Sequence, residues 1–590
     1  MPFLLTATPT GDVGVLFNGS YRNLGPINSY EGTTPEEKIA HAFLHLGIDL
    51  VKHLRGDFSL YLISDSFSYL ARDRFGIVPV FYTFEEEVLR YGEAIADVYT
   101  GQAVDEHAVY AYLNCYSDTE PTANAATFFK GICSLPQGCY LYWKKGQDPV
   151  VKAYWKPEPE NSLGRNQEAL FQDFKDRIFT SVRQRVEPYT HVAAHLSGGL
   201  DSSVMAIALA ELGYRNFPTL YFDIQDPKQV DPFYANIVSE KIGSRHFHLN
   251  PSDLDIYTSV AQVSKATGYP EQFILPSNVQ MVLAQKAKAL GSEAILTGID
   301  GDSIVGHGWA YMEKLKKDQD WEAFFALMEK MRRGRLGARG MHEILEKESA
   351  QAIKKNSGLW KLLSVGRKHY GYYSHHFIQF LMRSVWQRML SPRVAVAENY
   401  FLRAAYSEWV AEKTKSIEDL YDHSDEEIVQ NFKAAINAGY PKQFLQFDAI
   451  GKIYDQKFLF PFFDQSLFEL CLGIPDSMRF GEGHTRWLMR EAMRSRMPKS
   501  LYLRQGKDDF SLYLKRSCLE LWQKNADRFM GNEQLWQIIH QDRFIKKMKQ
   551  ICAPNFNFQG PLLHYRKLNR ILYLGIWLET LELDRAKVSQ

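Results

Sequence analysis

The sequence predicts an α/β protein with two unlike parts. Between about residues 10 and 145, short apolar segments lie between turn residues, a pattern typical of an antiparallel, layered fold. After residue 165, short apolar strands alternate with helical stretches, which favours a parallel sheet with helices on its faces. The segment Lys156–Gly164 between them is polar and rich in proline, so we expect domains at 1–155 and 165–590.

The strands and helices can be placed in chain order. In the first domain the sequence predicts strands at 58–64, 68–71, 78–82 and 88–91. In the second it predicts strands at 192–196, 217–222 and 294–297, and helices at 169–182, 204–213, 232–242 and 277–290. Residues 312–440 form a helical insertion rich in aromatic and basic residues, which suits either peptide binding or packing between helices.

Composition describes an ordinary soluble enzyme. Of 590 residues, 45% are hydrophobic and 23% are charged, and Lys plus Arg equals Asp plus Glu at 69 each. This balance argues against a nucleic-acid partner. There is no signal peptide and no uncharged apolar run of about 18 residues, and the six cysteines are scattered. We expect a cytoplasmic protein with reduced thiols and no membrane span.

The segment from Leu196 to Ser203 is the most informative motif, because a strand, a glycine loop and a helix start follow one another. Gly198 and Gly199 let the backbone approach an anion, and the Ser197, Ser202 and Ser203 hydroxyls add donors. The motif predicts a cradle for the pyrophosphate of ATP. The alternative is a serine-capped helix that merely follows a strand.

Acidic residues in two loops predict a magnesium site. Asp201 stands among the phosphate donors, and Asp300 and Asp302 follow the strand at 294–297. Two carboxylates with phosphate oxygens suit Mg²⁺. We expect Asp201 to bind the ion with Asp302, or with Asp300 in its place; the alternative is an Asp-rich turn.

A third group of motifs lies near the C-terminus. The apolar run 458–463 ends in Asp464, Arg486 and Arg490 are one helical turn apart, and Lys507 lies in the segment 504–510. Taken alone, these patterns are typical of a capping carboxylate and a solvated helix face.

Together the motifs resemble the asparagine synthetase family, in the class B type that carries a class II glutamine amidotransferase domain. The matching segments, in order, are 17–23, 54–58, 71–79, Tyr154–Trp155, 197–203, Thr297–Gly298, Asp302, 461–464 and Lys507. The resemblance implies an N-terminal αββα sandwich and a C-terminal pyrophosphate-loop domain that uses ATP and Mg²⁺. It implies Lys507 as the residue that stabilises charge on the reacting phosphate, catalysis with Asp201 and Asp302, and nucleotide contacts at Leu196, Thr297 and Gly298.

The sequence departs from the family in the first domain. Pro2 stands where the family has its nucleophilic cysteine, only 17 residues precede Asn18, and Ser20 replaces a glutamate. Without a thiol nucleophile the covalent hydrolysis of glutamine is lost. Cys115 and Cys133 are poor substitutes, because neither offers a terminal amine as base. We expect a degenerate amidotransferase domain.

Another amine must then be the nucleophile. The segment 483–510 resembles lasso-peptide cyclases, while Ile299 occupies the position of a catalytic tyrosine in β-lactam synthetases. We expect adenylation of an Asp or Glu side chain and macrolactam closure of a ribosomal peptide after leader processing. A processing protease or leader-binding protein is the expected partner, and a homodimer is open. The alternatives are an ammonia-dependent asparagine synthetase, a β-lactam synthetase-like cyclase and a catalytically silent binding module.

Overall fold

The structure, a computed structural model, describes most of the chain. The described residues are 4–8, 11–19, 21–113, 126–162, 164–226, 229–333, 358–369, 401–402, 439–504, 506, 508, 510–552 and 562–588.

Two antiparallel sheets form the N-terminal domain. The larger has the order β1-β2-β3-β4-β8-β9 and the smaller β6-β5-β7. Their strands are β1 (Leu4–Thr8), β2 (Gly11–Asn18), β3 (Ser59–Ile63), β4 (Phe67–Arg72), β5 (Phe81–Glu85), β6 (Val88–Gly92), β7 (Cys133–Ser134), β8 (Cys139–Lys144) and β9 (Val150–Ala153).

Side chains of the larger sheet alternate between two cores, as a pleated strand requires. Leu60 and Leu62 pack toward the outer helices, whereas Tyr61 packs toward the smaller sheet. The outer helices are η1 (Tyr21–Ser29), α1 (Pro35–Leu46) and η2 (Gly47–His53), and α2 (Ile95–Val98) and α3 (Glu106–Leu113) lie beyond the smaller sheet. The expected αββα sandwich is therefore confirmed.

The predicted strand at 78–82 is wrong in its boundaries. Pro79 has no N–H to donate, and the N–H of Val78 donates to the Asp73 carboxylate at 2.9 Å. Pairing in β5 therefore begins at Phe81.

A five-stranded parallel sheet forms the second domain, in the order β12-β11-β10-β13-β14. Its strands are β10 (Val192–His195), β11 (Pro218–Phe222), β12 (Arg245–Leu249), β13 (Ala294–Leu296) and β14 (Lys457–Leu459). Val192, Ala193 and Ala194 are all buried, so β10 is covered on both faces and not half-exposed as its alternation suggested.

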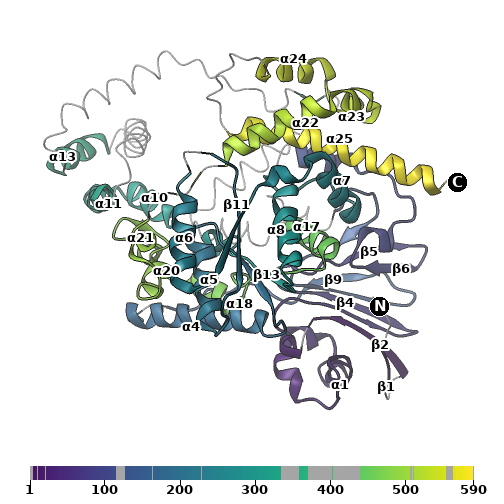
Figure 1. Ribbon diagram of the computed structural model, residues 1–590. Coiled ribbons are helices and arrows are strands. Elements are labelled where there is room, and N and C mark those ends of the chain that lie inside the picture. Colours follow the sequence, from purple (N-terminus) through teal and green to yellow (C-terminus); the bar gives the residue numbers. More distant parts are fainter. Residues whose placement is uncertain are drawn as a thin grey trace.

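Helices cover both faces of this sheet (Figure 1). One layer holds α4 (Gln167–Val186), α5 (Leu200–Glu211) and α6 (Asp231–Ile242), and the other holds α7 (Ile256–Thr267), α8 (Asn278–Ala289) and α17 (Gly439–Tyr454). The chain runs outward from β10 to β11 and β12, then crosses to β13 on the other side. Strand order therefore reverses between β10 and β13, where ligands bind in open α/β sheets.

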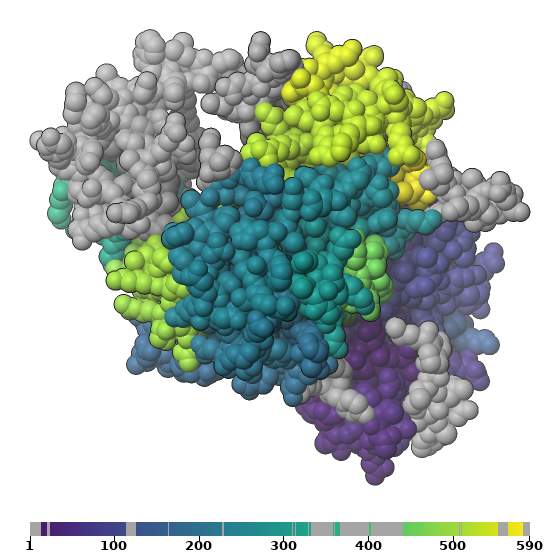
Figure 2. Space-filling model, viewed as in Figure 1, coloured from purple at the N-terminus to yellow at the C-terminus, as the bar shows by residue number. Residues whose placement is uncertain are grey.

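The remaining elements surround the carboxyl edge and one end of the sheet. They are η5 (Pro251–Asp253), α9 (Gly301–Val305), α10 (Trp309–Lys317), α11 (Trp321–Arg333), α13 (Leu359–His369), α18 (Gln465–Gly473), α19 (Asp476–Arg479), β15 (Phe480–Gly481), β16 (His484–Thr485), α20 (Trp487–Ala492), α21 (Lys499–Tyr502), α22 (Ser511–Gly531), α23 (Glu533–Ile538), α24 (Gln541–Ile551) and α25 (Leu562–Val588). In Figure 2 the helices from α22 onward, in yellow-green and yellow, lie at the upper right of the view, and α25 packs on α3 of the N-terminal domain. No helix among the described residues is long and apolar enough to cross a membrane.

The two domains share a packed boundary. The ring of Phe75 meets the rings of Trp155, Phe463 and Phe468 at centroid distances of 5.2, 5.6 and 5.6 Å. Beside it, the buried guanidinium of Arg185 pairs with a carboxylate of the first domain. The first domain is thus anchored to the segment that follows β14.

We expect Phe75→Ala to lower the free energy of unfolding by about 3–5 kcal/mol, because it leaves a cavity between three aromatic rings. Guanidinium unfolding curves would measure the loss. Val88→Ala, at a side chain that is 46% exposed, is the matched control and should change stability by less than about 0.5 kcal/mol. Equal effects of the two variants would contradict the packed boundary.

Candidate functional site

The glycine loop lies at the carboxyl end of β10, beside the loop that follows β13. Gly198 has a φ of +77°, and a Cβ there would lie 2.2 Å from the carbonyl oxygen of Asp231 and 2.7 Å from the nitrogen of Ala235. Only glycine fits this position, because the loop rests directly on the first turn of α6. Gly199 caps α5 without a side-chain hydrogen bond, which leaves N–H groups of the first turn free for an anion.

The loop serines bond to each other. The hydroxyls of Ser197 and Ser202 lie 3.1 Å apart, and the N–H of Gly199 donates to the Ser197 hydroxyl at 3.3 Å. Ser203 is completely buried, and its hydroxyl has no partner among the described residues. Ser197 and Ser202 can turn toward a phosphate, whereas Ser203 lies beneath the surface.

Arg504 holds the loop from the other side. Its guanidinium donates to the carbonyl of Gly198 at 2.8 Å and to the Asp231 carboxylate, and it stacks over the ring of Tyr234 at 4.3 Å. Asp508 accepts the N–H groups of Val230 and Asp231 at 2.7 Å each. Lys507, the predicted catalytic lysine, is outside the described residues. Arg504 and Asp508, on either side of it in the chain, both form hydrogen bonds with Asp231 at the start of α6.

Asp201 and the α9 segment meet across the site. A Cβ on Gly301 would lie 2.9 Å from the Cβ of Asp201, so the start of α9 lies close to this side chain. Asp302 follows Gly301, and its Oδ2 lies 3.8 Å from Nε2 of His307. Burial opposes the charge of Arg486, but the Asp201 and Asp302 carboxylates outweigh it and raise its pKa above the usual range. Arg486 therefore bonds to Asp201 and lies near enough to Asp302 to interact with its charge.

Asp300 points to a different partner. It starts α9 in a left-handed conformation, with a φ of +57°. Burial and then the Asp300 carboxylate raise the pKa of the Tyr440 hydroxyl, which also bonds to Asp300. Asp300 is thus bonded to Tyr440, whereas Asp302 interacts with the charge of Arg486 beside Asp201.

Sequence reasoning did not assign a role to three arginines. Arg486, Arg490 and Arg504 line a small pocket with the first residues of α5 and with Leu501 and Gly506. Arg486 pairs with Asp201 at 2.6 Å, and the two side chains are 12% and 11% exposed. The helical spacing of Arg486 and Arg490 suggested a solvated face, but α20 turns this face toward the glycine loop.

Two of the pocket arginines are paired with carboxylates, Arg486 with Asp201 and Arg504 with Asp231, and Arg490 adds a further positive charge. Arg490 donates to four backbone carbonyls, those of Thr485, Leu501, Tyr502 and Arg504. Burial and the neighbouring Arg486 lower the pKa of Arg490 to about 9, and burial and Arg490 lower that of His484 to about 4. These shifts mark a site where an added anion would be stabilised.

The donor set fits Mg²⁺ held together with phosphate. Asp201 Oδ1 is buried and has no hydrogen-bond partner among the described residues, so it can take a cation. The described residues contain no cluster of three or more His, Cys, Asp or Glu side chains suited to a metal. Two carboxylates would therefore need phosphate oxygens or water to complete an octahedral shell.

Three other predicted residues lie deeper. Leu196 and Thr297 are completely buried, and the Thr297 hydroxyl donates to the carbonyl of Leu459 at 2.9 Å. A Cβ on Gly298 would lie 2.5 Å from the nitrogen of Ser202. Contact of these residues with a nucleotide would go through backbone atoms, and Gly298 brings the β13 loop against α5.

Asp464 has the ordinary role its pattern suggested. Its carboxylate accepts the N–H groups of Ser466 and Leu467 and so caps α18. In the helical insertion, Trp321 is buried against Phe324, which supports core packing there. Much of 312–440 lies outside the described residues.

Asn18, which lies in the first amidotransferase-like segment, already has a side-chain hydrogen-bond partner. Its amide nitrogen lies 2.9 Å from both oxygens of Glu93, and Ser59 donates to the same carboxylate. Pro2, Ser20 and Cys115 are outside the described residues. A carboxylate at Asn18 opposes the binding of an oxyanion there.

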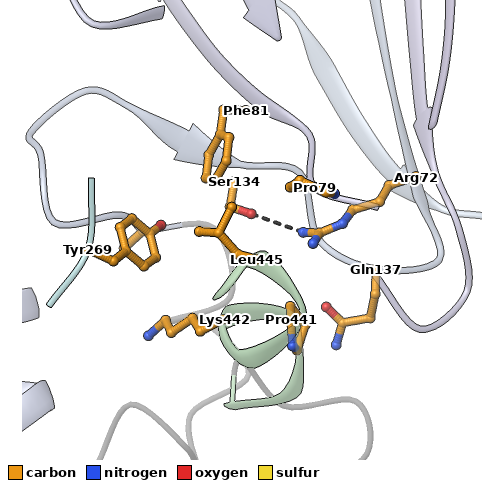
Figure 3. Close-up of a pocket in the computed structure, with 10 residues that line it drawn as sticks. Arg72, Pro79, Phe81, Ser134, Gln137, Tyr269, Pro441, Lys442 and Leu445 are labelled. Carbon is orange, nitrogen blue, oxygen red and sulfur yellow. Dashed lines mark hydrogen bonds between the residues drawn. The ribbon is translucent and has the colours of Figure 1, made fainter. Parts of the chain in front are cut away.

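A second small pocket lies between the N-terminal domain and α17 (Figure 3). Arg72 is fully buried beside it and donates to Ser134 and to the carbonyls of Gly76, Val78 and Leu135. These hydrogen bonds show that the guanidinium supports the surrounding loop. We therefore interpret the pocket as a gap in the packing at the boundary of the domains.

Comparison with known proteins places both halves of the chain. Residues 173–579 match the family model described as asparagine synthase, and residues 17–155 match the glutamine amidotransferase domain. The chain is 30% identical over 188 residues to amidase chyE of Penicillium rubens, covering 31% of this chain and 27% of that protein. It is 24% identical over 294 residues to a putative asparagine synthetase (glutamine-hydrolyzing) of Mycobacterium bovis, covering 47% and 44%.

A third relative is covered almost throughout. Identity to asparagine synthetase (glutamine-hydrolyzing) 1 of Bacillus subtilis is 20% over 597 residues, covering 95% of this chain and 85% of that protein. The chain spans 27% and 44% of the length of the first two relatives.

We expect Gly198→Ala to weaken binding of ATP at least about tenfold, because the new methyl group would displace the loop from α6. Isothermal titration calorimetry would measure it. Gly213→Ala is the matched control: Gly213 also has a positive φ, but a Cβ there meets no atom within 4 Å. If both variants bound ATP alike, contact with α6 would not be what shapes the loop.

Proposed function

The chain belongs to the asparagine synthase family, and from this membership we propose that it is an ATP-dependent ligase that joins a carboxyl group to an amine. The single observation that carries the proposal is the arginine-lined pocket at the end of β10, with its glycine loop, helix N-terminus and two carboxylates. This combination suits the cleavage of ATP to AMP and pyrophosphate.

The chemistry follows from the weakness of a carboxylate as an electrophile. The substrate carboxylate attacks the α-phosphate of ATP, an acyl-adenylate forms, and pyrophosphate leaves; the amine then attacks the acyl carbon and AMP leaves. The first turn of α5, with Ser197 and Ser202, binds the pyrophosphate. Asp201 and Asp302 would hold Mg²⁺, which neutralises charge on the phosphates.

Lys507 is proposed to stabilise the reacting phosphate and then the tetrahedral oxyanion. Its neighbours support this role, because Arg504 and Asp508 bind the glycine loop and the start of α6. Arg490 contributes a fixed positive charge behind the pocket, since its guanidinium is held by backbone carbonyls.

The nucleophile is proposed to be an amine other than ammonia from glutamine. The side-chain amide of Asn18 donates to the carboxylate of Glu93, which argues against a working glutaminase site. The fungal relative is named an amidase, and amide chemistry agrees with the proposed bond type.

The substrate is proposed to be a peptide that closes to a macrolactam after its leader is processed. Val230, Phe233 and Leu503 are 50%, 60% and 46% exposed, and they flank residues that hold the glycine loop. Exposed apolar side chains beside a phosphate pocket suit a peptide better than free aspartate. A processing protease or leader-binding protein is the proposed partner.

We expect the purified protein to form AMP and pyrophosphate with linear peptides that carry a free N-terminal amine and one Asp or Glu. Coupled pyrophosphate release and mass spectrometry, which detects the loss of one water from the peptide, would measure it. Turnover of free aspartate with ammonium would instead identify an ammonia-dependent asparagine synthetase.

We expect Asp201→Asn to reduce pyrophosphate release by about a hundredfold or more, because it removes a ligand charge at the phosphates. The fold should persist, since Asn keeps an oxygen that can accept from Arg486. Asp455→Asn, at a carboxylate that is 87% exposed, is the matched control. Circular dichroism and thermal melts complete the test, and an unfolded Asp201→Asn would show that Asp201 is structural.

A further inference from the structure

The contact between Arg486 and Asp201 is incomplete. Arg486 Nη1 lies 2.6 Å from Asp201 Oδ2, whereas Arg486 Nε and Asp201 Oδ1 are both buried and have no hydrogen-bond partner among the described residues. A bidentate pair would use both oxygens and two nitrogens. Because buried polar atoms without partners are costly, each of these groups gains from a better partner.

The other two arginines of the pocket are held more completely. Arg490 donates to backbone carbonyls, and Arg504 bonds to Gly198, Gly506 and Asp231. Moving either one would break several buried hydrogen bonds. Among the described pocket arginines, Arg486 is therefore the one whose guanidinium can move at the lowest cost.

The backbone of Arg486 is strained. Its φ of +55° and ψ of +43° place it in the left-handed region, at the junction of β16 and α20. Arginine has no side-chain advantage in this conformation, unlike Asn or Asp, and such strain is concentrated at functional sites. This backbone conformation directs the side chain across the pocket toward Asp201.

We propose that Arg486 has two successive partners: it bonds to Asp201 before ATP binds and transfers its guanidinium to the pyrophosphate group when ATP binds. The inference rests on the proposed function, because it assigns Asp201 to the metal and Arg486 to the phosphates. Each buried atom that lacks a partner then acquires one. In the empty enzyme Arg486 competes with a divalent cation for Asp201, so metal and nucleotide bind together.

The first test measures cation binding without nucleotide, with Mn²⁺ as the probe and electron paramagnetic resonance as the readout. Wild-type full-length protein should bind Mn²⁺ weakly, and Arg486→Gln should bind it at least about tenfold more tightly because Asp201 is released. Arg486→Lys, which retains the charge, should bind it weakly. Equal Mn²⁺ affinities in wild type and Arg486→Gln would overturn the proposal.

The second test measures pyrophosphate binding by calorimetry in the absence of divalent metal. Arg486→Gln should lose at least about tenfold in affinity, since a charge-assisted contact is removed. Arg494→Gln is the matched control, because Arg494 is 67% exposed and pairs with Glu491 outside the pocket. Unchanged pyrophosphate affinity in Arg486→Gln would overturn the transfer of the guanidinium.

Folding and function can be separated from this result. Arg486→Asn, whose side chain tolerates a left-handed backbone, repeats both measurements if Arg486→Gln fails to fold. Neither assay needs a carboxyl substrate or an amine. A protein that shows both binding effects but forms no AMP with any substrate would contradict the proposed function and leave the role of Arg486 intact.

Discussion

Close packing at three glycines is the constraint on which the site depends. Gly198 rests on the backbone of α6, Gly298 on the backbone at the start of α5, and Gly301 on the side chains of Phe462 and Asp201, and each position would place a Cβ within 2.9 Å of a neighbouring atom. Three loops can therefore converge at the point where strand order reverses. Larger side chains would separate the glycine loop from the carboxylates, and the helix N-terminus would lose its place in the pocket.

Charged side chains complete the site that the glycine contacts arrange. Arg504 bonds at once to the glycine loop and to Asp231, so it links the loop to α6 through a buried pair. Arg490 carries its charge without a carboxylate within 4 Å among the described residues. A buried arginine beside a helix N-terminus is the basis of the proposed phosphate site, because the low polarity of its surroundings strengthens charge interactions.

The support for this pocket comes from distant parts of the chain. A Cβ on Gly483 would lie 2.6 Å from the nitrogen of Met331, so the turn before Arg486 rests on α11. Lys330 pairs with Glu482 at the same contact. The N-terminal domain is held through Phe75 and Arg185 to the segment after β14, which makes it a structural partner of the ligase domain.

The sequence by itself determined the fold class and the chemistry of the glycine loop. Alternating strands and helices, Gly198, Gly199 and Asp201 are local signals, because turn geometry and helix starts depend on neighbouring residues. Tertiary structure alone placed Arg486, Arg490 and Arg504 around the glycine loop. A helical spacing of four indicates that two arginines share a face, but not whether that face meets water or a loop distant in the chain. The same holds for the bond between Asp300 and Tyr440, which reaches the site from α17. Long-range packing determines these contacts, and a local sequence pattern cannot predict them.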